Sequence, residues 1–233
     1  SLLAQNLDLP NIFEGLEVLL HIKYEDSLEA FVLSHAGFLG EFGLNNQPVG
    51  ICCNSLSGYL NNSLNGLPFT FIIRSVLEQP NLEKAIDFIK NIQHASAQNY
   101  LIGGLERIIC LECSANKIQQ FKLNKDASRI CHTNHPLKND DLIKPPLNPA
   151  GVITTYDRYD YLETRLQDSS KKITVDTIKN ILSSHFGPVC IHHTNKPNSV
   201  YTFSSVIYSL SKPPTLYITV GPPCLTEYEQ FEF

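Results

Sequence analysis

The chain has 233 residues, and its formal net charge at pH 7 is -5. An apolar fraction of 42% and a charged fraction of 18% are typical of a packed globular protein and exclude a disordered chain. No run of basic residues interleaved with aromatics occurs, and no apolar stretch reaches the length of a membrane span. We therefore expect neither nucleic acid nor a membrane as a partner. The length predicts a single domain over residues 1–233.

The cysteine content points to a reducing compartment. The seven cysteines are an odd number, and several lie in apolar sequence, for example Cys52, Cys53 and Cys110. We interpret them as free thiols of a core rather than as a disulfide framework. Free thiols favour a reducing compartment, so we expect a cytoplasmic location. Assembly into an oligomer is compatible with this composition.

The first part of the chain is predicted to be mainly strands. The first strand, 2–8, is apolar and then becomes polar before Pro10. Segments rich in Val, Leu, Ile and Phe predict further strands at 16–24, 29–35 and 49–53. The glycine-rich segment 37–46 and the Ser/Asn/Gly-rich segment 55–66 are typical of loops.

Two helices and a meander of strands follow. Pro68 is well placed to begin a helix over 69–78, and Asn81 is the expected cap of a second helix with one apolar face. From residue 99 the hydrophobic period becomes that of strands. These strands are predicted at 100–102, 107–112, 118–123 and 129–132.

The last part of the chain repeats this order of helices and strands. Prolines in 136–151 predict a long loop, and Tyr159, Leu162 and Leu166 mark the buried face of the helix after it. Thr174 is the expected cap of a further helix. Closing strands are predicted at 201–210, 215–220 and 228–233. Because strands and helices come in blocks, we predict an α+β fold in which two sheets lie between two helix layers.

Polar side chains at strand ends are the candidate site residues. The first strand ends in Gln5, Asn6 and Asp8, which must find hydrogen-bond partners or line a site. The alternative is an ordinary turn before Pro10. Asn54 and Asn134 end two other predicted strands.

The chemistry of these groups fits attack on a carbonyl. Asn54 and Asn134 could donate N–H bonds to a developing oxyanion, and Asp8 could hold an amine. Arg158 could bind a substrate carboxylate or anchor Asp8. Each of these residues taken alone is more often a cap or a turn former.

Five segments in the same order along the chain carry a family resemblance. They are 5–8 (Gln-Asn-Leu-Asp), 50–56 (Gly-Ile-Cys-Cys-Asn-Ser-Leu), 95–102 (Ala-Ser-Ala-Gln-Asn-Tyr-Leu-Ile), 132–135 (His-Thr-Asn-His) and 221–228 (Gly-Pro-Pro-Cys-Leu-Thr-Glu-Tyr). Together they resemble the autoproteolytic acyltransferase and hydrolase family typified by isopenicillin N acyltransferase (acyl-coenzyme A:6-aminopenicillanic acid acyltransferase). This family belongs to the N-terminal nucleophile (Ntn) hydrolases and is more distantly related to choloylglycine hydrolases and penicillin V acylases.

The resemblance implies a four-layer αββα sandwich and a precursor that cuts itself before a cysteine. The new N-terminal thiol attacks an acyl group, and its own α-amine serves as the base. By motif matching, Asp8 holds that amine, and Asn54 and Asn134 form or support the oxyanion hole. Arg158 matches an active-site arginine. No cofactor is implied.

The resemblance also indicates substrate contacts. Gln5 stands where choloylglycine hydrolases carry arginine, which argues against bile-salt specificity. We expect Gln5 and His135 to contact the substrate, a small-molecule amide or acyl donor.

The expected nucleophile has no counterpart among these residues. Ser1 is only seven positions before Asp8, too close for a separate strand, a turn and a return. We therefore expect the nucleophile strand to precede Ser1, and we predict a cysteine amidohydrolase or acyltransferase that works through a thioester. The alternative is a non-catalytic binding or scaffold relative that has lost its nucleophile.

A metal-dependent hydrolase is a weaker alternative. His132 and His135 lie three apart, and His192 is followed by His193, but neither pair has a recognisable third ligand. Cys110 and Cys113 have no second cysteine pair with matching spacing. We therefore expect no metal site. Cys224 follows Gly-Pro-Pro without an identifiable base, and we interpret Cys52 and Cys53 as core residues.

Overall fold

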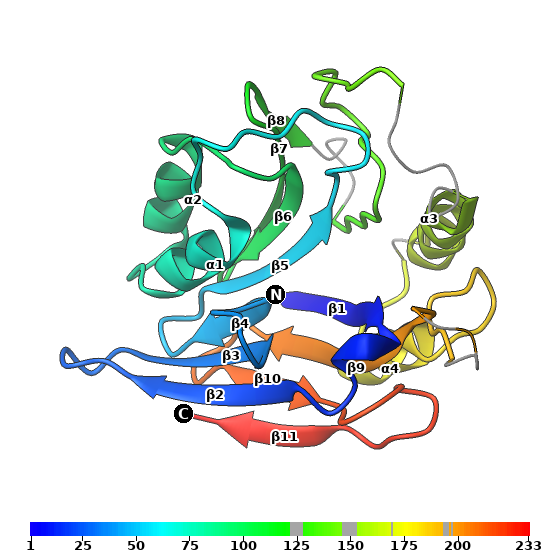
Figure 1. Cartoon of the computed structure of the whole chain (residues 1–233). Helices are drawn as coiled ribbons and strands as arrows, with labels where there is room; N and C mark the ends of the chain where they lie inside the picture. Colours follow the sequence, from blue (N-terminus) through cyan, green and yellow to red (C-terminus); the bar gives the residue numbers. More distant parts are fainter. Residues whose placement is uncertain (122–127, 146–152, 169, 193–195, 197) are drawn as a thin grey trace.

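Two antiparallel sheets lie face to face in the computed structural model, and helices cover their outer sides (Figure 1). The structure describes residues 1–121, 128–145, 153–168, 170–192, 196 and 198–233. The larger sheet has the order β2 (Glu17–Lys23), β3 (Glu29–His35), β4 (Phe42–Asn45), β5 (Gly50–Ser55), β6 (Gln98–Gly103), β7 (Ile108–Cys113) and β8 (Ile118–Phe121). The smaller sheet has the order β1 (Leu2–Pro10), β9 (Val200–Ser209), β10 (Thr215–Ile218) and β11 (Glu229–Glu232).

The helices form one pair for each sheet. Helices α1 (Phe69–Leu77) and α2 (Leu82–Lys90) contact β4, β5 and β6 of the larger sheet. Helix α4 (Val175–Leu182) contacts β1 and β9, and α3 (Ile153–Leu166) contributes Tyr161 and Leu162 to the same outer cluster. A short 3-10 helix, Asn11–Phe13, follows β1. The predicted αββα sandwich is thus confirmed.

Alternation along β1 places it between two hydrophobic clusters. Leu3 and Leu7 belong to the core between the sheets, whereas Ala4 packs in the outer cluster with α4. Side chains of a strand alternate between its faces, which explains this division. The strand continues to Pro10, so its polar residues are part of the strand, and the alternative of a turn is wrong.

The predicted helix starts are confirmed by their caps. The Asn81 side chain accepts a hydrogen bond from the backbone N–H of Lys84, and α1 begins directly after Pro68. Thr174 and Thr177 form a reciprocal capping box at the start of α4.

Two local predictions are wrong. Residues 42–45 form β4, although the glycine-rich segment 37–46 was predicted to be a loop. A Cβ added at Gly43 would lie 2.4 Å from Leu77 Cδ1, so this glycine lets α1 approach the sheet closely. Residues 129–132 form no strand, because side chains hold this segment. The Arg129 guanidinium donates to backbone carbonyls, among them those of Leu166 and Asp168. The predicted loop at 136–151 lies partly outside the described residues.

All seven cysteines are free, and every one except Cys224 is buried, as predicted. Among the described residues, no helix has the length and apolar character needed to cross a bilayer.

Candidate active site

A cavity of about 1020 Å³ runs along β1, and residues 1–8 all contribute to its wall. Within the described part of the chain, β1 is an edge strand that pairs with β9 on one side only. Both faces of an edge strand can border the space beside it, which is how Gln5 and Asp8 line one cavity. Asn54, Asn134 and Arg158 lie in the same wall. The structure therefore brings together five of the six predicted site residues.

Asp8 is positioned by an irregularity between β1 and β9. Leu7 is paired with Ser204 and Asp8 with Thr202, so Phe203 is an extra residue on β9. Such bulges re-aim side chains and often occur beside active sites. The Thr202 hydroxyl donates to Asp8 Oδ1 at 2.6 Å. Burial raises the pKa of Asp8, while the Thr202 hydrogen bond and the charge of Arg158 act in the opposite direction.

Arg158 and Asn134 form a connected pair opposite Asp8. Arg158 Nη2 donates to Asn134 Oδ1 at 3.0 Å, and Asn134 Nδ2 donates to the Ser55 carbonyl at 3.2 Å. The Nε of Arg158 is buried without an acceptor among the described residues. Burial lowers the pKa of Arg158, and the neighbouring charge of Asp8 acts to raise it. A buried guanidinium with a free donor is suited to binding an anionic or carbonyl oxygen.

The end of β5 supplies the other amide. Asn54 Oδ1 accepts a long hydrogen bond of 3.4 Å from Asn99 Nδ2, and Asn99 is fully buried beside the thiol of Cys110. Among the described residues, none accepts from Asn54 Nδ2, so its N–H groups remain for a ligand. Gln5 Nε2 donates to the Cys53 carbonyl, and Gln5 Oε1 is buried without a described partner.

His135 is the one predicted site residue that does not line the cavity, and its substrate contact stays a prediction. Its Nδ1 lies 3.0 Å from the Thr155 hydroxyl, and its ring packs on Tyr156 with a centroid distance of 4.1 Å. Burial is the main cause that lowers the pKa of His135 to about 4. The residue is therefore a neutral packing group that supports the segment carrying Asn134.

His132 is part of a buried pair that the sequence did not reveal. Its Nε2 lies 2.8 Å from Glu112 Oε1, and both side chains are fully buried. Burial acts to raise the pKa of Glu112, but hydrogen bonds from His132 and from the backbone N–H groups of Leu137, Asn139 and Lys138 lower it overall. Since His132 Nδ1 also lies 2.6 Å from the Thr133 carbonyl, both ring nitrogens are occupied. These bonds fix the backbone that presents Asn134 to the cavity.

Two further residues near the site were not predicted from the sequence. Thr202 lies in β9, outside the cavity wall, and nothing in its local sequence indicates its contact with Asp8. Glu41, in the segment predicted to be a loop, lines the cavity, and burial raises its pKa to about 7. Burial also raises the pKa of Cys53 well above its usual range, so its thiol is a poor nucleophile despite its place in the wall.

One group of potential metal ligands occurs among the described residues, away from the cavity wall: His185, Cys190, His192 and Cys224. The partner weighed for His192 from the sequence was His193, which lies outside the described residues.

The facing sheets and their helix layers have the αββα arrangement of the Ntn-hydrolase fold. Conjugated bile acid hydrolase from Clostridium perfringens, in a variant structure, is similar with a TM-score of 0.65 and 12% identity, over 100% of this chain and 93% of that chain. Penicillin V acylase from Agrobacterium tumefaciens is similar with a TM-score of 0.53 and 12% identity, over 100% of this chain and 81% of that chain. At these identities the likeness establishes the fold.

The chain belongs to the acyl-coenzyme A:6-aminopenicillanic acid acyl-transferase family, whose model matches residues 13–223. The family resemblance carried by the five segments is thus confirmed. No match was found among curated proteins.

Proposed function

We propose that this protein is a cysteine amidohydrolase or acyltransferase of the Ntn type, activated by cleavage of its own chain before a cysteine upstream of Ser1. The observation that carries the proposal is the convergence of Asp8, Asn54, Asn134 and Arg158 on one cavity. It lies along the edge of β1 that no described strand pairs with. Membership of an acyltransferase family supports the same reaction class.

The edge of β1 offers a place for the nucleophile strand. Unpaired backbone groups of an edge strand can accept a further strand, and residues 1–8 border a cavity of about 1020 Å³. We propose that the segment upstream of Ser1 pairs there and brings its cysteine beside Asp8. The remaining volume would hold a small linear amide or acyl donor.

Asp8 would hold the α-amine of that cysteine. Burial raises the pKa of Asp8, so a cation placed beside it would restore the carboxylate by direct attraction. A free α-amine has a pKa of about 7.7–8.0, so near neutrality it can take the proton of the adjacent thiol. The carboxylate would fix the amine in position, and Thr202 would fix the carboxylate through its hydrogen bond.

The two asparagines would stabilise the oxyanion. The thiolate sulfur forms a bond to the carbonyl carbon, and the carbonyl electrons move to oxygen. Asn54 keeps its N–H groups for a ligand, and Asn134 Nδ2 has a second hydrogen besides the one directed at Ser55. Collapse of this intermediate breaks the C–N bond, and the leaving amine takes the proton from the α-ammonium. Water or an acceptor amine then releases the acyl group from the thioester.

Arg158 would act on Asn134 and on the substrate. One nitrogen of its guanidinium holds the Asn134 carbonyl oxygen, which turns the amide N–H groups away from Arg158. Its buried Nε is left to bind a substrate oxygen. Gln5 borders the same cavity without a charge, so we do not propose bile-salt conjugates as substrates.

The test is intact mass and N-terminal sequencing of the protein produced from its full-length gene, together with a variant in which the expected upstream cysteine is alanine. We expect the wild-type chain to begin with cysteine about one hairpin before Leu2, and the variant to stay uncut. Iodoacetamide should label that cysteine faster than Cys52 or Cys53, whose burial makes them an internal control. An uncut wild-type chain with no Cys, Ser or Thr at that place would instead favour the non-catalytic relative.

A further inference from the structure

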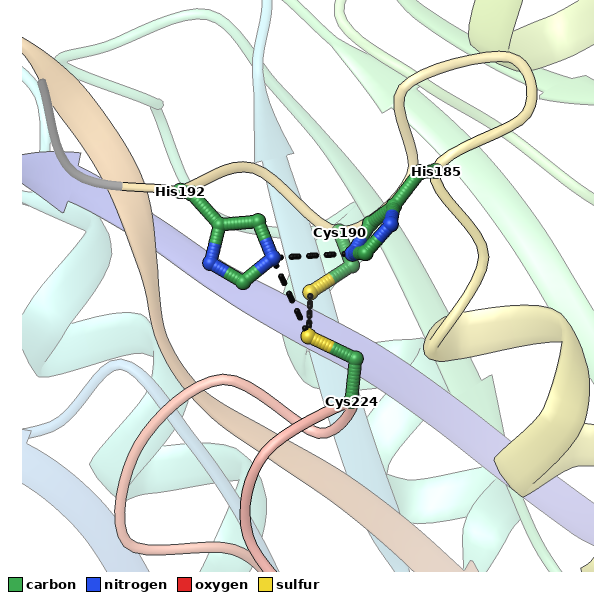
Figure 2. A group of neighbouring side chains, drawn as sticks. All are labelled: His185, Cys190, His192 and Cys224. Atoms are coloured by element: carbon green, nitrogen blue, oxygen red, sulfur yellow. Dashed lines mark hydrogen bonds between the residues drawn. The ribbon is translucent and has the colours of Figure 1, made fainter.

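Four side chains from two connecting segments of the chain point toward one another (Figure 2). His185, Cys190 and His192 lie between α4 and β9, and Cys224 lies between β10 and β11. Each offers one nitrogen or sulfur atom, and these atoms all lie within 4.8 Å of one another. Residues far apart in the sequence thus place two imidazoles and two thiols around one point.

The distances approach those of a tetrahedral metal site. His192 Nε2 lies 2.8 Å from His185 Nε2 and 3.2 Å from Cys224 Sγ, and the two sulfur atoms are 3.4 Å apart. Around Zn²⁺, bonds of about 2.3 Å to sulfur and about 2.0 Å to nitrogen give separations of roughly 3.3 Å between nitrogens and 3.8 Å between sulfurs. These three contacts would therefore have to open by about half an ångström or less to fit the ion. The remaining pairs of ligand atoms, which all lie within 4.8 Å, would adjust around it.

Contacts outside the cluster hold the backbone that carries these ligands. The Cys190 N–H donates to the Ser184 carbonyl at 2.9 Å and closes the turn that carries His185. The Ser183 hydroxyl donates to the Pro223 carbonyl at 3.0 Å, which joins the end of α4 to the turn of Cys224. Within that turn, the Leu225 N–H donates to the Pro222 carbonyl at 2.9 Å. The ligands are thus presented by backbone that is already folded.

We propose that His185, Cys190, His192 and Cys224 bind a Zn²⁺ ion. Two sulfurs and two imidazole nitrogens without a carboxylate suit zinc and do not suit magnesium or calcium, which prefer oxygen. Since the protein fills all four positions, the site is closed and its role is structural. A disulfide between the two cysteines would leave the convergence of both histidines unexplained.

The ion would fasten the turn of Cys224 to the segment between α4 and β9. That segment is also paired with β9 through Thr202. The Ile191 N–H donates to the Thr202 hydroxyl oxygen, and the Thr202 N–H donates to the Ile191 carbonyl, each at 2.9 Å. Bound zinc would therefore stiffen the chain next to the residue that holds Asp8, while taking no part in the chemistry.

Metal binding is measured on the whole chain, kept in a phosphine reductant, stripped with a chelator and titrated with Zn²⁺ or Co²⁺. The variants are Cys224→Ser and His185→Ala, and His185 is exposed, so its removal leaves the core intact. His21→Gln and Cys113→Ala are matched controls outside the cluster. Circular dichroism checks that each variant is folded.

We expect one Zn²⁺ per chain, a rise in Tm on binding, and a Co²⁺ adduct with thiolate charge-transfer absorption and the visible bands of a tetrahedral ion. Loss of one ligand should weaken binding by at least about 100-fold, since even residues that only support metal ligands cost 10- to 100-fold. Both controls should bind as the wild type does. Absence of binding by the wild-type chain, unchanged affinity in folded Cys224→Ser and His185→Ala, or a Co²⁺ adduct without thiolate absorption would overturn the proposal. A disulfide between Cys190 and Cys224 that survives the reductant would overturn it as well.

Discussion

Replacement of Glu41 by glutamine should remove a large part of the pH dependence of stability. The Glu41 side chain is buried, and its Oε1 lies 3.2 Å from His35 Nδ1. Although this distance is that of an ion pair, burial lowers the pKa of His35 and raises that of Glu41 to about 7. We therefore treat the two groups as a neutral pair in the folded protein.

The sign of the effect follows from the raised pKa. An unfolded glutamate has a pKa of 4.5, so between that pH and about pH 7 only the unfolded chain loses the proton. The stabilisation that Glu41 contributes is fully present below its unfolded pKa of 4.5. It is lost as the pH rises through the folded pKa of about 7. A rise of the pKa from 4.5 to about 7 corresponds to about 3 kcal/mol, and most of it falls between pH 5 and pH 8.

Urea unfolding of wild type and Glu41→Gln at about pH 5 and pH 8 measures this difference. We expect the wild-type free energy of unfolding to fall by about 2–3 kcal/mol more than that of the variant between the two pH values. Comparison of the two chains cancels the other titrating groups. An equal fall in both proteins would show that Glu41 titrates normally and would refute the reasoning.

Thr202→Val should lower the free energy of unfolding by about 1–3 kcal/mol, because it leaves Asp8 and the Ile191 N–H without their hydrogen bonds to the hydroxyl. Urea unfolding measures this loss, and an unchanged urea midpoint would contradict the prediction. Asp8→Asn should abolish turnover of the processed enzyme while its circular dichroism stays unchanged, since burial already disfavours the charged carboxylate; wild-type rates would remove Asp8 from the mechanism. Asn134→Ala should reduce kcat by about 10²–10³ if Asn134 is an oxyanion donor, and an unaltered kcat would exclude that role. Gly43→Ala should cost about 1–3 kcal/mol of stability through its clash with Leu77, whereas Gly58→Ala, where a Cβ would have no neighbour within 4 Å, is the control.

Periodicity and caps made most of the fold predictable. Asn81 and Thr174 act as the helix caps that their positions in the sequence indicate. The strand β4 was missed because glycine content reports local backbone freedom and not the contacts that a residue makes with distant parts of the chain. Gly43 is needed by the close approach of Leu77, a contact over a long sequence separation that composition does not contain.

The candidate site was predictable where a polar side chain follows an apolar run, and it was not predictable where the partners come from distant segments. Asp8 and Asn54 follow apolar residues of β1 and β5, so they stand out in the sequence. Asn134 was predicted as the end of a strand that the structure does not form, and it reaches the cavity through its bonds to Arg158 and Ser55. Glu112 looks like an ordinary strand residue, and its bond to His132 exists only because residues 132–139 lie beside β7. His135 is a different case, since its proximity in sequence to Asn134 suggested the cavity while its ring packs on Tyr156.

Thr202 is the physical link between the proposed active site and the proposed zinc site. The bulge at Phe203 sets Thr202 opposite Asp8, and the same hydroxyl oxygen that donates to Asp8 accepts from the Ile191 N–H. The Thr202 hydroxyl has one hydrogen, which it donates to Asp8. The hydrogen bond that its oxygen accepts from the Ile191 N–H helps to fix the direction in which that hydrogen points. Because Ile191 lies between two proposed zinc ligands, Cys190 and His192, movement of that segment would change the orientation of this hydroxyl. The position of the carboxylate therefore depends on a turn outside the cavity.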